Sequence, residues 1–165
     1  AFLDLVGYPF ECGEQLASRV LAIAALGDAL AALAPESKDK AGEMKARVER
    51  DLQALRSLQN GDGGFPFWRR GDPSWPFVSV HVAHAAALAK SKGFAVPAEL
   101  LERSRAYLRE VANRFPSDYP AEVKRSIRAY ALEVRRRMGD ADPKAARALL
   151  REAKIEEQPL EALAW

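Results

Sequence analysis

The chain has 165 residues, of which 48% are hydrophobic and 29% charged, a composition typical of a folded domain rather than a disordered segment. The net charge is only +2 and the basic residues form no dense stripe interleaved with aromatics, which argues against nucleic-acid binding. No run of about 18 apolar residues occurs, so no membrane span is expected, and a single cysteine excludes an internal disulfide. The arginine run at 135–137 is expected to be the solvated end of a helix.

Apolar residues recur at helical spacing and are interrupted by proline and glycine, which predicts an all-α fold without a convincing β-strand. Six helices are expected before Pro159, which opens a further apolar segment. Their ranges are 13–33, 38–59, 76–92, 97–115, 121–138 and 143–153. Similar lengths and short connections are typical of successive helical hairpins. Because the last apolar pattern stops unfinished, we expect residues 1–165 to be part of a longer array whose units bury each other's faces.

Burial is expected on one face of the fifth helix and in the loop after the second. The inward residues of the fifth helix are expected to be Val123, Ile127, Tyr130, Ala131 and Val134. Residues 60–64, Asn-Gly-Asp-Gly-Gly, predict a turn with positive φ angles. In the irregular segment that follows, Phe65, Phe67 and Trp68 are expected to pack the loop against the helices.

The single cysteine stands at the start of the first helix, in the sequence Cys12-Gly13-Glu14-Gln15. At this spacing, a turn entering a helix brings the cysteine sulfur beside the glutamine carboxamide. Attack of the thiolate on that carbonyl, with loss of ammonia, gives an intrachain thioester, which is a good acyl donor because sulfur leaves readily. The helix N-terminus favours the thiolate and a developing oxyanion, and Gly13 is expected to supply backbone freedom for the ring.

Each of these residues also has a structural interpretation. A lone cysteine near a helix start is usually a small buried hydrophobe, and four matching residues alone are a weak motif. Glu14 is a first-turn acid that complements the helix dipole, but it is also placed to orient Gln15 or to shuttle a proton, and these roles stay open. Tyr8 packs before the helix or shields the thioester.

His81 and His84 are the only histidines, and their spacing lets them share one face of the third expected helix. An imidazole titrates near neutral pH, so either residue is a candidate acid or base for an incoming nucleophile. Helix packing is the competing interpretation. A zinc site is disfavoured because no third ligand is evident, and we expect no metal.

Three segments resemble the thioester region of the α2-macroglobulin and complement superfamily. The family pattern is Cys-X-Glu-Gln, preceded by Tyr-Pro in bacterial members and often followed by Ser-Arg. It is matched here by Tyr8, Pro9, Cys12, Glu14, Gln15, Ser18 and Arg19. Residues 58–68 resemble the family's Gln-X-X-Asp-Gly-Gly-Phe-X-X-Trp turn, and residues 75–85 resemble the helix after that turn in bacterial members.

The resemblance implies a thioester-containing domain built as an α/α toroid, of which this chain would be the N-terminal portion, with six to seven helices. It implies a Cys12–Gln15 cross-link in place of any cofactor, shielded by Tyr8, Phe65 and Trp68. The implied role is broad-spectrum protease inhibition without turnover: cleavage elsewhere in a multidomain parent unmasks the thioester, which couples to a lysine or hydroxyl of the protease.

The implied parent is exported to the bacterial periplasm and in many members is anchored by an N-terminal lipid. For this part of it, neighbouring domains are the expected contacts, not membrane or nucleic acid.

Two other functions are compatible with this helical pattern. Terpene cyclases and protein prenyltransferases are α/α toroids whose Gln-X-X-Asp-Gly repeat resembles the segment at Gln59, but they need an acidic cluster or zinc ligands, and here the aspartates are scattered in turns. The second is a helical interaction module in which Cys12 is inert.

Complement members that prefer hydroxyl targets use a histidine in a much later loop, and no residue here matches that position.

Overall fold

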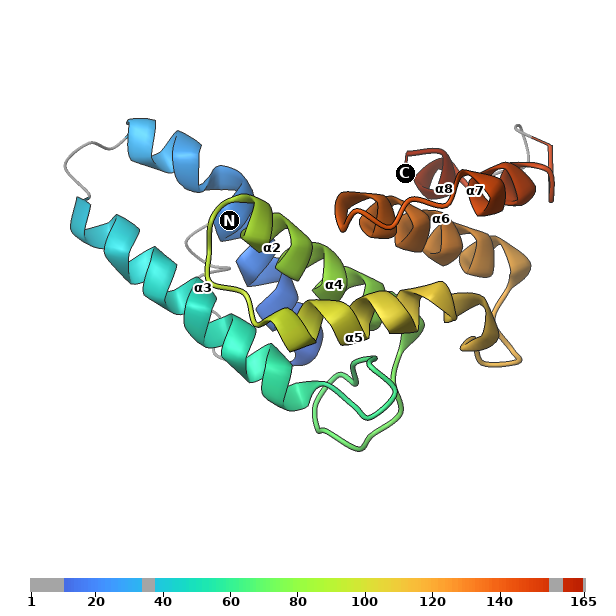
Figure 1. Cartoon of the computed structure of the whole chain (residues 1–165), viewed down its shortest axis with the longest axis horizontal. Helices are drawn as coiled ribbons and strands as arrows, with labels where there is room; N and C mark the ends of the chain where they lie inside the picture. The colour runs from blue at the N-terminus through green and yellow to red at the C-terminus, as the bar shows by residue number, and fades with distance from the viewer. Residues whose placement is uncertain (1–10, 34–37, 155–158, 165) are drawn as a thin grey trace.

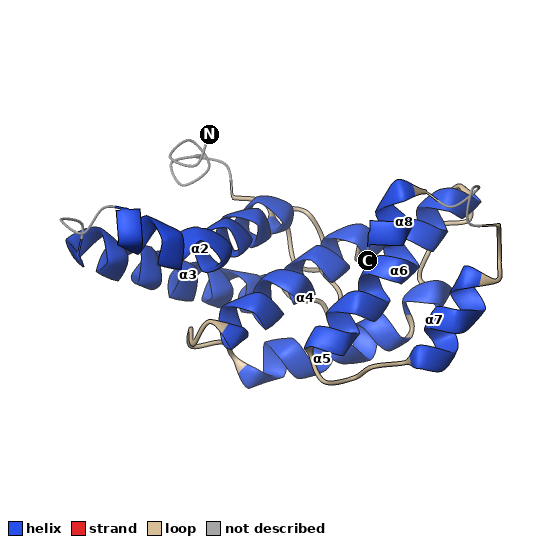
Figure 2. Ribbon diagram, turned by 90° about the horizontal axis from the view of Figure 1, so that it is seen from above, coloured by secondary structure: helices blue, strands red, loops and turns tan. Residues whose placement is uncertain are grey.

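The computed structural model describes residues 11–33, 38–154 and 159–164, and within these ranges it contains helices and no β-strand (Figures 1 and 2). The all-α prediction is therefore confirmed. The elements in chain order are α2 (Gly13–Leu33), α3 (Lys38–Leu58), α4 (Pro76–Ser91), α5 (Ala98–Arg109), a 3-10 turn (Val111–Asn113), α6 (Ala121–Arg137), α7 (Pro143–Leu150) and α8 (Leu160–Ala164). None of the described helices is both long enough and apolar enough to cross a membrane.

Local signals set the ends of several helices. Pro76 is the first residue of α4, a position where a backbone N–H has no partner within the helix. Asp142 caps α7 by accepting a hydrogen bond from the Ala145 N–H at 3.0 Å. Gly93 and Gly139 follow α4 and α6 with φ angles of 82° and 75°, the left-handed conformation in which glycine ends helices.

Helix α4 lies at the centre of the fold, where it contacts α2, α3, α5 and α6 (Figure 1). Helices α2, α4, α6 and α8 contact one another in succession, while α3, α5 and α7 each pack against the helix that precedes them. This alternation is the arrangement expected of consecutive helical hairpins. The described helices form an open, elongated array (Figure 2), so closure into a toroid stays a prediction.

Two apolar clusters hold the helices together, and α4 contributes to both. Val78 and Val82 face the cluster shared with α2, α3 and α5, whereas Val80 and Ala83 face the cluster shared with α5 and α6. Each fully buried aliphatic side chain contributes about 1.5–3 kcal/mol relative to exposure. A helix buried on two sides needs apolar residues nearly all round, which is why the sequence of α4 has so few charges.

Two helices end earlier than predicted. The fourth, expected over 97–115, stops at Arg109 and tightens into the 3-10 turn Val111–Asn113. Apolar periodicity does not distinguish a short 3-10 turn from a continuing α-helix, so the predicted helix extends beyond the observed one. The sixth, expected over 143–153, ends at Leu150.

Burial on α6 follows the prediction except at its first turn. Ile127, Tyr130, Ala131 and Val134 are buried. Val123 is 37% exposed and lines an open cleft between α4 and α6, so its inward assignment is wrong. Its side chain lines this cleft and does not belong to the apolar cluster that α4 and α6 share.

A buried amide holds the loop between α3 and α4. Gln59 is 1% exposed, and its Nε2 donates to the carbonyls of Gly63 at 2.9 Å and Leu100 at 3.3 Å and lies 3.2 Å from the Ser104 hydroxyl. Gly63 has a φ of 88°, as the turn prediction requires, and a Cβ there would collide with the carbonyl of Arg103.

Replacing Gln59 with leucine is expected to lower the free energy of unfolding by about 1–3 kcal/mol, because buried carbonyls lose their donor. Urea denaturation monitored by circular dichroism measures the change. Gln53→Leu is the matched control, since Gln53 is exposed on α3, the helix that ends just before Gln59, and its replacement is expected to cost less than about 0.5 kcal/mol. Equal losses in the two variants would contradict this account of the loop.

Candidate functional site

Residues 12–15 form the start of α2. The Cys12 carbonyl accepts the first hydrogen bond of the helix, from the Leu16 N–H at 2.9 Å, so Cys12 is the N-cap residue. The Gln15 side chain folds back, and its Oε1 accepts a hydrogen bond from the Cys12 N–H at 3.2 Å. This contact is half of a capping box, and it satisfies a backbone donor at the helix entrance.

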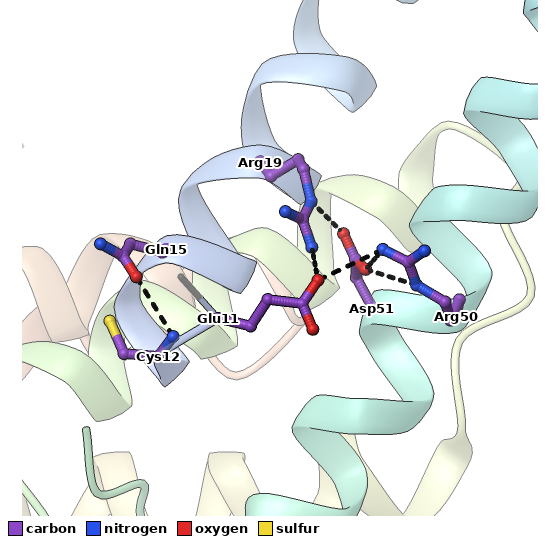
Figure 3. A network of polar contacts seen from close by, with 6 residues as sticks. All are labelled: Glu11, Cys12, Gln15, Arg19, Arg50 and Asp51. Atoms are coloured by element: carbon purple, nitrogen blue, oxygen red, sulfur yellow. Dashed lines mark hydrogen bonds and ion pairs between the residues drawn. The ribbon is translucent and has the colours of Figure 1, made fainter. Parts of the chain in front are cut away.

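The same hydrogen bond brings the two side chains of the thioester hypothesis together. In Figure 3 the Cys12 sulfur and the Gln15 carboxamide lie on the same side of the helix start. Cys12 is only 4% exposed, whereas Gln15 is partly buried. A nucleophilic sulfur and an electrophilic carbonyl therefore share one turn at the positive end of the helix dipole.

Gly13 lies against the backbone of the loop that follows α3. Its N–H donates to the Phe67 carbonyl at 2.6 Å. A Cβ at this position would lie 2.8 Å from the Pro66 carbonyl oxygen and 3.0 Å from the Leu58 side chain. Gly13 does not have a positive φ angle. The structure gives a steric reason for this glycine, because the loop occupies the space that any side chain would need. Backbone freedom for the thioester ring stays a prediction.

A buried ion pair joins α2 to α3 beside the site (Figure 3). The Nε of Arg19 donates to Asp51 Oδ2 at 2.6 Å, and these side chains are 2% and 0% exposed. Arg19 Nη2 also donates to Glu11 Oε1 at 3.1 Å, and Arg50 Nη2 donates to Asp51 Oδ1 at 2.9 Å. The hydrogen bond to Asp51 raises the pKa of Arg19 in spite of burial. Because Glu11 directly precedes Cys12, this network fixes the backbone immediately before the site.

A second polar chain runs from the first turn of α2 to α4. Ser18 Oγ donates to Glu14 Oε1 at 2.7 Å, one helical turn back. His81 Nε2 lies 2.9 Å from Ser18 Oγ and 3.9 Å from Glu14 Oε1. The His81 ring stacks on Phe77 with centroids 5.8 Å apart. Burial lowers the pKa of His81 below its usual 6.5, and the carboxylate of Glu14 partly offsets this effect.

His84 lies on the same side of α4, next to α6. Its Nδ1 is 2.8 Å from the Tyr130 hydroxyl, which is also 3.4 Å from His81 Nδ1. Burial lowers the pKa of His84 to about 4, with further lowering from Arg137 and His81 and an opposing effect of Glu133. The two histidines share a helix face as predicted, and it is His81 that contacts α2.

The predicted shielding residues have different positions. Tyr8 lies outside the described residues. Phe65 is fully buried, and its N–H donates to Ser79 Oγ at 2.8 Å. Trp68 is 61% exposed, so the prediction that it packs the loop is wrong, and its shielding of a thioester stays a prediction. The loop turns outward at this residue, while Phe67 is partly buried.

No three histidine, cysteine or acidic side chains gather as metal ligands would within the part of the chain that the structure describes. Sequence reasoning missed the roles of Ser18, Arg19 and Asp51. A detectable signal existed for the ion pair, since Arg19 follows Leu16 and Asp51 follows Val48 at a spacing of three residues on apolar helix faces. Charges in such positions are buried only when paired.

Asp51→Asn is expected to lower the free energy of unfolding by about 3–5 kcal/mol, because it leaves the buried guanidinium of Arg19 without its carboxylate. The matched control is Arg50→Ala, which removes a half-exposed partner of the same carboxylate and is expected to cost less than about 1 kcal/mol. Guanidinium denaturation of both variants checks the prediction. An Asp51→Asn protein as stable as the control would show that the ion pair does not anchor α2.

Stability is expected to fall as the pH drops from 6.5 towards 4. The folded pKa of His84 is about 4, below its unfolded value, so protons bind the unfolded chain more readily in this window. Above pH 6.5 the effect vanishes. Urea midpoints measured against pH test it, and His84→Gln is expected to reduce the slope. Arg109 and Arg135 lower the pKa of Asp140 to about 2. This carboxylate therefore titrates at a lower pH than His84. An unchanged slope in the variant would contradict the assignment.

Comparison with protein-family models gives no match for this chain. Among curated proteins it is similar to the α2-macroglobulin of Rickettsia conorii, with 33% identity over 114 residues that make up 68% of this chain and 6% of that protein. It is also similar to an α2-macroglobulin homolog of Yersinia pestis, with 30% identity over 112 residues, 67% of this chain and 5% of that protein. The chain thus spans only a small fraction of the length of these relatives.

Solved structures of bacterial α2-macroglobulins have the same fold over most of the chain. The Escherichia coli protein, in a structure running from its MG7 domain to the C-terminus, matches 90% of this chain and 24% of its own, with a TM-score of 0.70 and 22% identity. Salmonella α2-macroglobulin reacted with methylamine matches 90% of this chain and 10% of its own, with a TM-score of 0.72 and 22% identity. On the sequence similarities and this shared fold, the chain belongs to the bacterial α2-macroglobulin family, of whose full-length members it represents a small segment.

Proposed function

We propose that this chain carries the thioester centre of a protein that traps proteases covalently. The observation that carries the proposal is the first turn of α2, where the Gln15 carboxamide folds back onto the Cys12 N–H on the side of the sulfur. Two relatives add support: a Salmonella α2-macroglobulin has been reacted with methylamine, and an E. coli α2-macroglobulin has been activated with trypsin.

Formation of the thioester needs only the two side chains. The Cys12 thiolate attacks the carboxamide carbon of Gln15, and a tetrahedral oxyanion forms. Its collapse breaks the carbon–nitrogen bond, and the nitrogen leaves as ammonia with the proton that the Cys12 thiol gave up. The N-terminal end of α2 stabilises both negative species. Burial of Cys12 limits hydrolysis of the product, since water has little access to the sulfur side.

In the trapping reaction, the Cys12 sulfur is the leaving group and a side chain of the protease is the nucleophile. A lysine amine or a hydroxyl of the protease attacks the Gln15 carbonyl, the carbon–sulfur bond breaks, and Cys12 is released as a thiol. The product is an amide or ester between the two proteins, so the reaction occurs once per molecule and the protein acts as an inhibitor, not as an enzyme.

The rest of the parent protein would control this centre. In the proposal, neighbouring domains cover the Cys12–Gln15 face until a protease cleaves elsewhere, and the exposed Trp68 and the segment of Tyr8 help to exclude water. The helices continue into a closed α/α toroid. The parent is exported, with the periplasm and a lipid anchor as the expected location, where it would meet foreign proteases.

Intact mass spectrometry tests the proposal on the protein as the natural gene encodes it. The wild-type mass is expected to be about 17 Da below the value calculated from the sequence, the mass of the ammonia lost on thioester formation. Methylamine is then expected to add about 31 Da and to expose one thiol, since the amine becomes bonded to the Gln15 carbon.

The Cys12→Ala protein is the control and is expected to show the sequence mass and no methylamine adduct. A wild-type protein with the full sequence mass and an immediately titratable thiol would refute the proposal. Such a result would leave a helical interaction module as the function of the chain.

A further inference from the structure

The polar chain that ends on Glu14 has a defined hydrogen-bond direction. A carboxylate only accepts, so the hydroxyl hydrogen of Ser18 points at Glu14 Oε1, 2.7 Å away. Ser18 Oγ must then accept from His81 Nε2 at 2.9 Å, which places a hydrogen on Nε2. The contacts therefore select the Nε2–H tautomer of His81, with its Nδ1 towards the Tyr130 hydroxyl at 3.4 Å.

The hydrogen bonds through Ser18 connect the buried imidazole of His81 to the more accessible carboxylate of Glu14. The side chain of His81 is 15% exposed, whereas that of Glu14 is 36% exposed. Glu14 lies between Cys12 and Gln15 in sequence, on the turn where the proposed thioester forms. A target protein can therefore approach the carboxylate, while the imidazole behind it stays in a fixed, largely dry environment.

We propose that His81 is a positioning residue for the acyl transfer, acting through Ser18 to orient the Glu14 carboxylate as acceptor of the proton that the attacking amine releases. This inference rests on the proposed function and adds the route of the proton. Ser18 engages Oε1 of the carboxylate, which has a second oxygen with which to accept a proton.

The step balances as follows. The amine nitrogen forms a bond to the carbonyl carbon of Gln15, and the carbon–sulfur bond breaks with its electron pair going to the Cys12 sulfur. The proton lost by the amine passes to Glu14 and from there to the thiolate. The products are an amide and a thiol, and Glu14 returns to its ionised form.

The charge of His81 controls how well Glu14 accepts a proton. A second proton on the imidazole puts a positive charge 3.9 Å from Glu14 Oε1, which opposes the transfer of another proton to that carboxylate. Burial keeps the pKa of His81 below 6.5, so the ring is neutral at neutral pH. The titratable and charged groups around the two histidines come from the helices packed against them: Glu14 from α2, and Glu122, Tyr130, Glu133 and Arg137 from α6.

The test is the rate at which methylamine exposes the Cys12 thiol in the full protein, measured with a chromogenic disulfide from pH 5 to 9 at constant free-amine concentration. The wild-type rate is expected to be flat above pH 7 and to fall as His81 protonates. Ser18→Ala is expected to slow the reaction at pH 7.5 about tenfold or more, part of the ~10²–10⁴-fold that a positioned base contributes. Ser91→Ala is the matched control, an exposed serine of α4 that bonds within its own helix.

Two substitutions of His81 separate positioning from packing. Glutamine carries an N–H donor the same number of bonds from Cα as histidine Nε2, so His81→Gln is expected to keep the neutral-pH rate within about threefold and to lose the low-pH decline. His81→Leu fills the same apolar space without a donor and is expected to match Ser18→Ala. A residue needed only for packing would give the opposite order.

The outcomes distinguish the two proposals. A wild-type protein without a methylamine adduct overturns both. An adduct that forms at wild-type rates in Ser18→Ala and His81→Leu overturns only the role of His81. Nitrogen NMR of histidine in the Cys12→Ala protein gives an answer independent of reactivity, because the inference requires the Nε2–H tautomer of His81, and the Nδ1–H tautomer would exclude it.

Discussion

Where α2 packs against α3, the guanidinium of Arg19 and the carboxylate of Asp51 lie together out of water, 2.6 Å apart. Neither charge would be tolerated there alone, since an unpaired buried ion loses several kcal/mol of solvation. The pairing therefore sets the axial position of α2 relative to α3. The same guanidinium also binds Glu11, the residue before Cys12. The ion pair therefore fixes the position at which Cys12 begins the helix.

The helices could be predicted because each has its own local signal. Pro76, Asp142, Gly93 and Gly139 begin or end helices through backbone chemistry that needs no distant partner. The early end of α5 at Arg109 has no such signal, because neither glycine nor proline stands there. How the helices pack depends on contacts between segments far apart in sequence, which periodicity does not specify.

In the site, too, the local contacts could be predicted from the sequence and the long-range contacts could not. A spacing of three residues at a helix start places Gln15 over Cys12 through a local capping contact, so the sequence suffices for that pair. The approach of His81 to Ser18 spans 63 positions and depends on how α4 packs against α2. Trp68 shows the opposite case, because an aromatic residue in a loop carries no local information about the side on which it will lie.

The missing side chain at Gly13 links two parts of the molecule that lie more than fifty positions apart. Because the carbonyls of Pro66 and Phe67 fill the space beside it, the helix entrance and the loop cannot vary independently. The family pattern admits other residues at this position. A homologue with a larger residue there must carry a loop of different length or path. Grafting either segment alone between relatives would therefore produce a clash, whereas exchanging both together would preserve the fit.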